Sequence, residues 1–531
     1  MYKYIIKMEL PEVLKVQPLS RPVNQVCSTD ILQPTTFTQT QCKFVFDKKG
    51  ILDCNSKLHV AQTVVNTGIV PGVVPTDRSG INARCYLPTA TGATAMVRRA
   101  YLTIGGREVS DLLEVGHFNT WKRHHYSNEY KKGVATPHQA GNDVYVGSAS
   151  ATLDTNNDAT SKINRGFAPP YGTIGRCSSE YGIMSALSPE LNNVWGKPVA
   201  ALLDVSDAPK RLLTNDPTTT PGFLIELGQL CPVLVGLQLP LFAIEGEVAL
   251  VIEWAPKTWG HRFMYNLTDV EDVAVDKDKL VSTIVEEEVF LITDTLYYPE
   301  LMGEIHDQIM TKGGYSIPYD DVITQTNFLQ YEVADGETQK DLQITLSGKR
   351  VKRIITQTQQ DQEPVVATLC CGFYNSYALR KPKSYQYRID SNNFYALPLK
   401  NSALQRQEAN AIEGIPMVLN SSVFSFNNQA DQATGNIVAP NDFNLTNRDC
   451  NSHVQYNDAG TQFWTGIKIE NQMGQGHLMS SQPVIYSERS QATAFDPSVV
   501  DPTTLTQRVV RFFCLYQKVM NINGGLVEII S

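Results

Sequence analysis

Apolar and polar residues alternate along several separate stretches of the chain, the pattern of β-strands that bury one face. In the clearest stretch, 247–254, every even-numbered residue is apolar, whereas Glu247 and Glu253 fall on the opposite face with two small apolar residues. The same alternation predicts further strands at 288–298, 328–333, 342–346, 385–399, 461–469 and 508–520. Asp335-Gly336, between two of them, has the composition of a hairpin turn. The pattern therefore predicts a protein built mainly of short strands.

Two stretches depart from this alternation and predict short helices. Residues 111–126 carry apolar side chains at three-residue spacing, including Phe118 and Trp121, with Ser110 available as the N-cap. Residues 299–309 begin with a proline at the first helical turn and read as a brief second helix. Strand signals start afresh after it, so we place a domain junction there.

The chain is too long for one hydrophobic core. It has 531 residues, and single cores stop growing near about 250–300 residues. Residues 9–34 contain four prolines and little periodicity, which favours an extended arm. Residues 135–176 and 401–460 are long polar stretches of the kind that form functional loops. Many short strands joined by long loops favour β-sandwiches or jelly rolls.

Charge and composition limit the classes of molecule that the chain is expected to bind. The formal net charge is −9, and 19% of residues are charged. The densest basic stretches, 122–125 and 349–353, are short, and the second alternates with apolar residues as a strand does. Because phosphate neutralisation carries most nucleic-acid affinity, direct nucleic-acid binding is not expected. A surface rich in Thr, Asn, Gln and Ser instead suits extensive protein contact, although a polar, loop-rich β-protein would share it.

The cysteine pattern and the lengths of the apolar runs favour synthesis in the reducing cytosol. None of the ten cysteines stands in a C-x-x-C pair, which predicts buried free thiols rather than zinc ligands or a disulfide framework. The apolar stretch near the N-terminus is shorter than the ~7–15 residues of a signal-peptide core. No apolar run approaches the ~18 residues that span a bilayer.

The residues that could carry catalytic chemistry are isolated in the sequence and do not form a recognisable catalytic motif. Walker A, H-E-x-x-H and G-x-S-x-G motifs are absent from the sequence. His124 and His125 are adjacent and so point in different directions, which favours a surface or interface pair over a shared metal. The run 286–288 of three glutamates could hold a cation, but a solvated strand entry is the simpler interpretation. Asp320-Asp321 is interpreted as a turn.

Three further motifs have structural interpretations. The G-x-G at 474–476 favours a loop over a phosphate cradle. Phe512-Phe513 could stack on a ligand or a base, but its alternation with apolar residues favours core packing. Glycosylation acceptor patterns begin at Asn266, Asn420 and Asn444, without a secretory signal to support their use. We therefore predict no catalytic, cofactor-binding or metal-binding residues.

Four segments together resemble the double jelly-roll major capsid proteins of nucleocytoplasmic large DNA viruses, virophages and polinton-like viruses. The first is a strand ending in Ile104-Gly105-Gly106, followed by the helix that bears Trp121. The second is the acidic-flanked strand with an Asp-Thr pair and short helix at 285–308. The third is the basic-to-apolar strand at 349–359, and the fourth is the closing aromatic strand and Gly-Gly-Leu end at 508–526. Their order spans some 430 residues, which makes the combination more specific than any one segment.

The resemblance implies an all-β fold of two tandem eight-stranded antiparallel jelly rolls, with short helices and long loops. It divides the chain into an N-terminal arm (1–34), a first jelly roll (35–298), a linker helix (299–310) and a second jelly roll (311–531). The function it implies is that of a major capsid protein, not an enzyme and without a cofactor. Three copies would form a pseudo-hexagonal capsomer that tiles an icosahedral shell, beside neighbouring capsomers and penton, minor or cement proteins.

Under the same resemblance, the chain would be made in the host cytoplasm or a viral factory and would reside in the virion capsid. The long polar stretches would form towers or inter-subunit loops, and the proline-rich segment an inner arm. Two other functions stay open at this point. One is a jelly-roll receptor- or glycan-binding surface protein, and the other is an enzyme on a β-sandwich scaffold.

Overall fold

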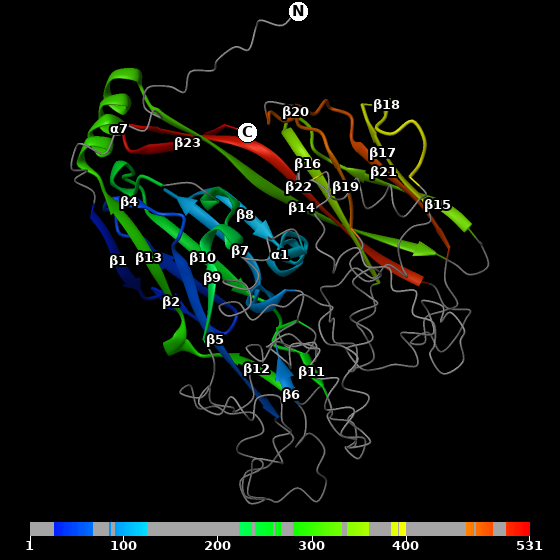
Figure 1. Ribbon diagram of the computed structural model, residues 1–531, viewed down its shortest axis with the longest axis horizontal. Coiled ribbons are helices and arrows are strands. Elements are labelled where there is room, and N and C mark those ends of the chain that lie inside the picture. The colour runs from blue at the N-terminus through cyan, green and yellow to red at the C-terminus, as the bar shows by residue number, and fades with distance from the viewer. Residues whose placement is uncertain are drawn as a thin grey trace, which may run out of the picture.

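The computed structural model places two groups of β-strands side by side (Figure 1). It describes residues 26–66, 84–86, 91–124, 222–235, 239–258, 261–262, 264–266, 280–331, 337–360, 384–390, 392–399, 412, 464–471, 474–491 and 506–530. The long polar stretches 135–176 and 401–460 lie outside these ranges, apart from residue 412, as do residues 1–25.

The first group contains eight strands that fold as a wrapped antiparallel ribbon. They are β1 (Val26–Leu32), β3 (Gln41–Val45), β5 (Lys57–Asn66), β7 (Val97–Ile104), β8 (Arg107–Leu113), β9 (Gly222–Glu226), β10 (Val248–Trp254) and β13 (Phe290–Tyr297). The first strand pairs with the eighth, the second with the seventh, the third with the sixth and the fourth with the fifth. The sheets therefore run β1-β13-β5-β9 and β3-β10-β7-β8, which is a jelly roll.

Short additional strands flank this path. They are β2 (Thr36–Phe37), β4 (Ile51–Leu52) and β12 (Leu280–Ile284), and a separate two-stranded sheet joins β6 (Arg84–Tyr86) to β11 (Met264–Asn266). The described strands of this half thus exceed the eight of the basic ribbon.

The second group repeats the same strand order. Its strands are β14 (Tyr315–Tyr331), β15 (Glu337–Ile344), β16 (Arg350–Gln360), β17 (Ser384–Ile389), β18 (Asn392–Asn393), β19 (Trp464–Lys468), β21 (Val484–Gln491) and β22 (Thr506–Asn523). The sheets run β14-β22-β16-β19 and β15-β21-β17-β18, so first again pairs with eighth and fourth with fifth. The short strands β20 (His477–Leu478) and β23 (Leu526–Ile530) extend the larger sheet. The expected fold class of two antiparallel jelly rolls is confirmed.

Helices occur mainly in and after the first roll. They are the 3-10 helices η2 (Gly92–Met96), η11 (Pro232–Leu234), η12 (Leu241–Ala243) and η14 (Glu286–Glu288), and the α-helices α1 (Val115–His124), α6 (Leu227–Leu230) and α7 (Pro299–Lys312). The second predicted helix is α7, which begins at the proline and ends before Gly313 in the left-handed conformation. Its apolar residues Ile305 and Ile309 are one turn apart and face the core.

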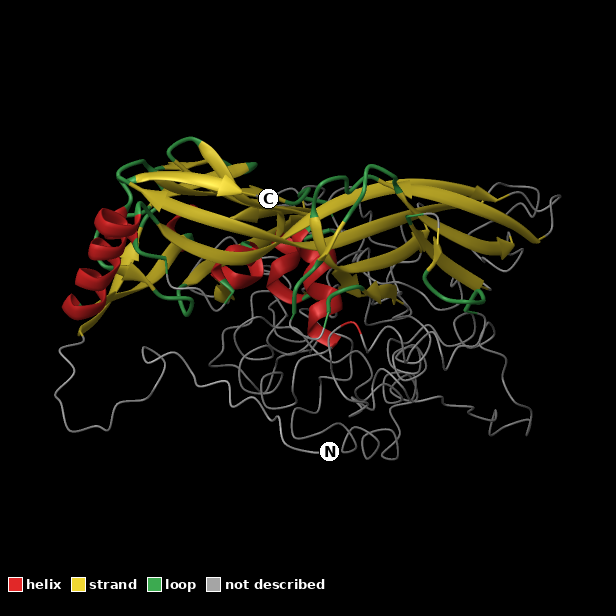
Figure 2. Ribbon diagram, turned by 90° about the horizontal axis from the view of Figure 1, so that it is seen from above, coloured by secondary structure: helices red, strands yellow, loops and turns green. Residues whose placement is uncertain are grey.

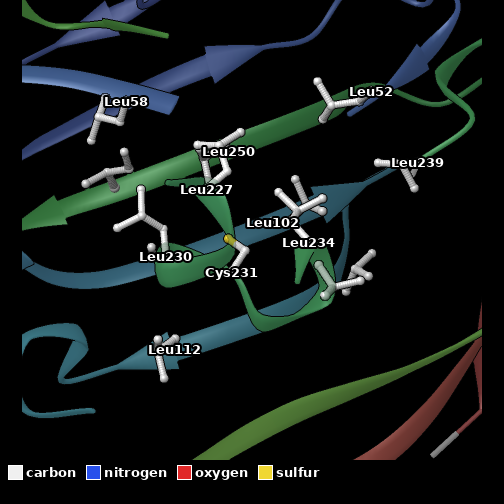
Figure 3. Packing of buried hydrophobic residues seen from close by; sticks show 14 of the residues in the cluster. Leu52, Leu58, Leu102, Leu112, Leu227, Leu230, Cys231, Leu234, Leu239 and Leu250 are labelled. Atoms are coloured by element: carbon white, nitrogen blue, oxygen red, sulfur yellow. The ribbon is translucent and has the colours of Figure 1, made fainter. Parts of the chain in front are cut away.

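The first roll closes over an aliphatic core. Leucines from both sheets meet there with Cys231 and the residues of α6 and η11, as Figure 3 shows. The strand predicted at 247–254 is confirmed, with Leu250 and Ile252 fully buried on one face. Its other face is largely buried as well, at Ala249 and Val251, and Glu253 there is half-exposed. The second roll has a core of its own, rich in tyrosine, that includes Tyr385, Tyr387 and Tyr486.

The strand pair β14 and β22 is long enough to belong to both rolls. It is paired without interruption from Tyr315–Ile522 to Tyr331–Thr506. At one end Ile317 and Met520 pack into the core of the first roll, and at the other Tyr331 packs into that of the second. Figure 2, seen from above, shows these strands running from one roll to the other, with α7 at the outer end.

Three sequence-based expectations are corrected by the strand pairing. The described part of the predicted arm is not detached, because β1 pairs with β13 over seven residues. The helix predicted at 111–126 begins only at Val115, because strand β8 continues to Leu113. Glu114, with a positive φ of 61°, separates the strand from the helix. The strands flanking Asp335-Gly336 do not form a hairpin, because β14 pairs with β22 and β15 with β21.

Candidate assembly edges and the seam between the rolls

The residues weighed as chemical candidates are dispersed over the fold. The glutamates 286–288 form the exposed or half-exposed helix η14 ahead of β13, as the strand-entry interpretation predicts. Gly474 lies in a loop with a φ of 73°. His124 ends α1 and its side chain lies outside the described residues, as does all of His125. These positions do not form one site.

Asp320 and Asp321 are where the sequence interpretation was wrong. They lie in the middle of β14 rather than in a turn. Asp320 points outward and pairs with Lys352 at 2.7 Å. Asp321 points inward and is only 2% exposed. Two adjacent acidic residues resemble a turn in sequence, but alternation along a strand gives them opposite environments.

Asp321 lies at the contact between the rolls, which we call the seam: β8 and α1 of the first roll against β14 and β22 of the second. Its carboxylate accepts a hydrogen bond from Ser110 Oγ at 2.9 Å and pairs with Lys518 Nζ at 2.6 Å. Lys518 Nζ also donates to the Val109 carbonyl at 3.2 Å. A buried charge needs such partners, since its desolvation is otherwise uncompensated. Ser110, predicted as a helix cap, therefore instead joins two strands.

Other seam contacts keep β8 alongside β14. Tyr319 OH donates to the Val109 carbonyl at 2.8 Å, and Thr324 Oγ1 donates to the Leu113 carbonyl at 3.0 Å. Burial raises the pKa of the Tyr319 phenol, so it remains a proton donor. Both contacts use side chains, and β8 and β14 belong to different sheets. The two sheet edges are thus joined without continuous backbone pairing.

The apolar part of the seam comes from α1. Phe118 packs against Phe513 with ring centroids 5.5 Å apart. The adjacent residue Phe512 points the other way, into the tyrosine-rich core of the second roll. The core-packing interpretation of Phe512-Phe513 is confirmed, and each ring serves a different roll.

A buried histidine lies at the start of α1. His117 Nδ1 is 2.9 Å from Glu114 Oε2. Burial and the charge of Arg511 lower the pKa of His117 to about 4 despite the carboxylate. Burial alone would raise the pKa of Glu114, but the hydrogen bond and charge of His117 lower it to about 2. The pair therefore joins a neutral imidazole to a carboxylate above about pH 4.

One exposed cluster contains Ser, His and Asp, the residue types of a nucleophilic triad, but the carboxylate rather than the imidazole occupies the middle position. Asp390 lies between Ser480 and His477: Ser480 Oγ donates to one carboxylate oxygen, and His477 Nε2 is 3.3 Å from the other. The hydrogen bonds from Ser480 and His477 lower the pKa of Asp390. A hydroxyl nucleophile needs an adjacent base that receives its proton and passes it on. Here the hydroxyl meets the carboxylate directly, so the cluster anchors a turn beside β20.

Within the described part of the chain, no group of three or more His, Cys, Asp or Glu side chains is placed to hold a metal ion. Cys27, Cys42, Cys54, Cys231 and Cys514 are free. Burial raises the pKa of three of them, Cys42, Cys231 and Cys514, which keeps these three as thiols. Among the same residues, no helix combines the length and apolar character needed to cross a membrane.

Comparison with known proteins finds likeness in structure only. No protein family and no curated protein matches the sequence. A chain in the cryo-electron microscopy structure of the Sputnik virophage is similar over 98% of this chain and 92% of its own, with 10% identity and a TM-score of 0.51. The major capsid protein of mavirus (98% and 93% covered, 9% identity, TM-score 0.47) and that of Faustovirus (96% and 93%, 10%, 0.45) also match.

The fold is a double jelly roll. The repeated strand order and the near-complete coverage of the Sputnik chain agree on this point. The resemblance inferred from four sequence segments is therefore confirmed at the level of the fold.

Two of those segments meet in the double jelly roll. The Gly105-Gly106 turn joins β7 to β8, and the Gly524-Gly525 turn joins β22 to β23, each with two positive φ angles as in a tight hairpin. Both turns contact the same loop, because Gly105 N donates to the Glu247 carbonyl at 2.8 Å and Glu245 N donates to the Gly525 carbonyl at 2.9 Å.

The close approach explains why glycine occupies the second turn. A Cβ on Gly525 would lie 2.3 Å from Glu245 Cγ. In addition, an Arg107 guanidinium nitrogen lies 3.4 Å from the Val527 carbonyl of β23, within hydrogen-bond reach. The C-terminal hairpin of the second roll thus lies on the first roll and adds to the seam.

Proposed function

We propose that this chain is a major capsid protein, three copies of which form a pseudo-hexagonal capsomer that tiles the icosahedral shell of a DNA virus. The observation that carries the proposal is the repetition of one strand order in two rolls joined by a buried seam. Because the seam fixes the rolls relative to each other, one copy acts as a unit with two similar lobes, and three copies supply six.

The structural neighbours support this proposal over a receptor- or glycan-binding role. The mavirus and Faustovirus chains, which match this chain over nearly its whole length, are major capsid proteins. A ring of identical chains uses heterologous contacts, in which two different patches meet. Such contacts can each be modest, since a shell multiplies them.

The finer parts of the proposal follow from this role. The chain has a structural rather than a catalytic function, and it resides in the virion capsid after synthesis in the host cytoplasm or a viral factory. Its partners are other copies of itself, neighbouring capsomers, and penton, minor or cement proteins. With a net charge of −9 it does not bind nucleic acid directly.

Mass measurement of the purified chain tests the proposal. Sedimentation should give a particle near three times 59.0 kDa, and electron microscopy should show six-lobed particles that pack as hexagonal plates. A monomer at all accessible concentrations that is retained on a glycan column would contradict the proposal and favour the receptor-binding alternative.

A further inference from the structure

We propose that copies of this chain join through two particular sheet edges: the β18 edge of one copy (Asn392 to Leu399) docks on the β1 edge of the next (Val26 to Leu32). The inference rests on the proposed function and names the surfaces that its trimer uses. The partner is a second copy of the same chain.

The internal repeat identifies these edges. In each roll the first strand and the fifth strand lie at sheet edges: β1 and β8 in the first roll, β14 and β18 in the second. Among the described strands, β1 pairs with β13 alone and β18 with β17 alone. Within the chain, the fifth strand of the first roll already lies against the first strand of the second, which is the β8–β14 seam. The corresponding pair, β18 and β1, has no counterpart in the chain among the described residues.

The β1 edge has the surface of an interface. Ile31 is 66% exposed, Val26 is also exposed, and Ile292 beside Ile31 on β13 is half-buried. The strand carries a single charge, Asp30, and no lysine or proline. Lysine and proline commonly guard free edges in soluble proteins, so an edge that lacks both and exposes Ile31 is open to association.

The β18 edge begins with Asn392-Asn393 and contains Pro398, but the residues between them expose apolar side chains and are held in place. Leu397 is 76% exposed and Phe394 is 37% exposed, and no charged residue occurs from Asn392 to Leu399. Backbone hydrogen bonds fix this segment against β17: Phe394 N donates to the Tyr387 carbonyl at 2.8 Å, and Leu399 exchanges two bonds with Tyr385. A surface ordered before binding loses little conformational entropy on docking.

The seam also predicts which groups meet. After β8 the chain presents Phe118, which packs on Phe513 in the last strand of the second roll. After β18 the chain presents Phe394 and Leu397, and the last strand of the first roll presents Ile292. Because the two edges differ, their contact is heterologous and propagates head to tail, so it closes a ring when the rotation per copy is one third of a turn.

Charge substitutions test this contact on the full chain. Leu397→Glu and Ile31→Glu each place a carboxylate in the apolar contact, and each should weaken trimer formation at least ~10-fold. Combining Ile31→Glu with Leu397→Arg should restore trimers relative to Ile31→Glu alone, because Ile31 is paired with Ile292 on β13 and the two opposite charges then lie in the same contact. Met310→Glu is the matched control: Met310 is 72% exposed on α7, which belongs to neither edge, and this variant should assemble like the wild type.

Sedimentation and circular dichroism separate the outcomes. Folded monomers for both glutamate variants, with rescue in the charge-swapped double variant, support the inference. Wild-type trimers together with full-strength assembly of Leu397→Glu and Ile31→Glu, or a double variant no better than Ile31→Glu alone, overturn it and leave the proposed function intact. A wild-type chain that is always monomeric overturns both. If Ile31→Glu does not fold, Cys27→Glu replaces it, since Cys27 is exposed on the same strand.

Discussion

The β8–β14 contact and the β18 and β1 edges use the same parts of a jelly roll in opposite circumstances. In the first, a fifth strand lies against a first strand inside one chain, where Asp321 and Phe513 are buried and Lys518 is mostly buried. In the second, the corresponding edges expose Leu397 and Ile31 to solvent. The comparison indicates that one type of contact can fuse two domains or join two copies, according to whether a covalent linker connects the partners.

The difference in polarity between the two regions is also informative. The seam contains a buried ion pair and carbonyl-directed hydrogen bonds, which are costly to leave unpaired and so specify one alignment. The open edges instead carry apolar side chains, which a single unassembled copy can expose to solvent without leaving a buried polar group unpaired. Substitutions in the seam should therefore change unfolding, whereas substitutions at the edges should change assembly.

Asp321→Ala should have the largest effect on unfolding. Removing the carboxylate leaves the Lys518 ammonium in a mostly buried position without its partner, which typically costs about 3–5 kcal/mol. Urea denaturation at one protein concentration measures the change. Asp320→Ala is the control on the next residue: its carboxylate is exposed, so we expect about 0–1 kcal/mol. Equal effects at the two positions would mean that the seam is not the buried contact described here.

The Glu114–His117 pair should make the seam sensitive to acid. The pKa of His117 is about 4 in the folded chain and ordinarily 6.5, so between these values the unfolded chain takes up a proton that the folded chain does not. Stability should fall by about 1–3 kcal/mol as the pH is lowered through this window. Glu114, with its pKa lowered from 4.5 to about 2, adds a further loss below pH 4.5. His117→Gln should flatten the dependence between pH 6.5 and 4, and an unchanged slope would contradict the assignment.

Thr324→Val should have a smaller effect. The substitution keeps the shape of the side chain and removes the hydrogen bond to the Leu113 carbonyl, which is worth about 0.5–1.5 kcal/mol. Thr326→Val, two residues along the same strand and exposed, should stay within about 0.5 kcal/mol of the wild type. Denaturation curves that do not distinguish the two variants would remove Thr324 from the seam.

Ile31→Ser should have the smallest effect on unfolding and a clear effect on assembly. The side chain is largely in solvent in a single copy, so unfolding of the dilute chain should change by less than about 0.5 kcal/mol. Sedimentation at increasing concentration should nevertheless show weaker trimers. A large loss of stability in the dilute chain would indicate that Ile31 already packs within its own copy.

The sequence predicted individual strands better than their partners. Alternation located β10 and β13 to within two residues, and Pro299 located the start of α7. It could not show that β14 pairs with β22, 175 to 207 positions away, rather than with its neighbour across Asp335-Gly336, because pairing depends on contacts remote in sequence. The three-residue apolar spacing also did not reveal the boundary at Glu114. Leu112 belongs to a strand and Val115 to a helix, although both fit one helical spacing.

The seam itself was not predicted. Asp321 is indistinguishable from Asp320 by composition, and its role depends on Ser110 and Lys518, which approach it only after both rolls have formed. The double-glycine turns were a usable signal, since they carried the resemblance. That they meet at one loop, 245–247, follows from the fold alone.

The most direct test of the central claim is a cryo-electron microscopy map of the purified full-length chain. We expect three copies with six jelly-roll lobes, in which each β8–β14 seam alternates around the ring with a β18–β1 contact between copies. A single-copy particle, or a trimer whose β1 edges face solvent, would contradict it.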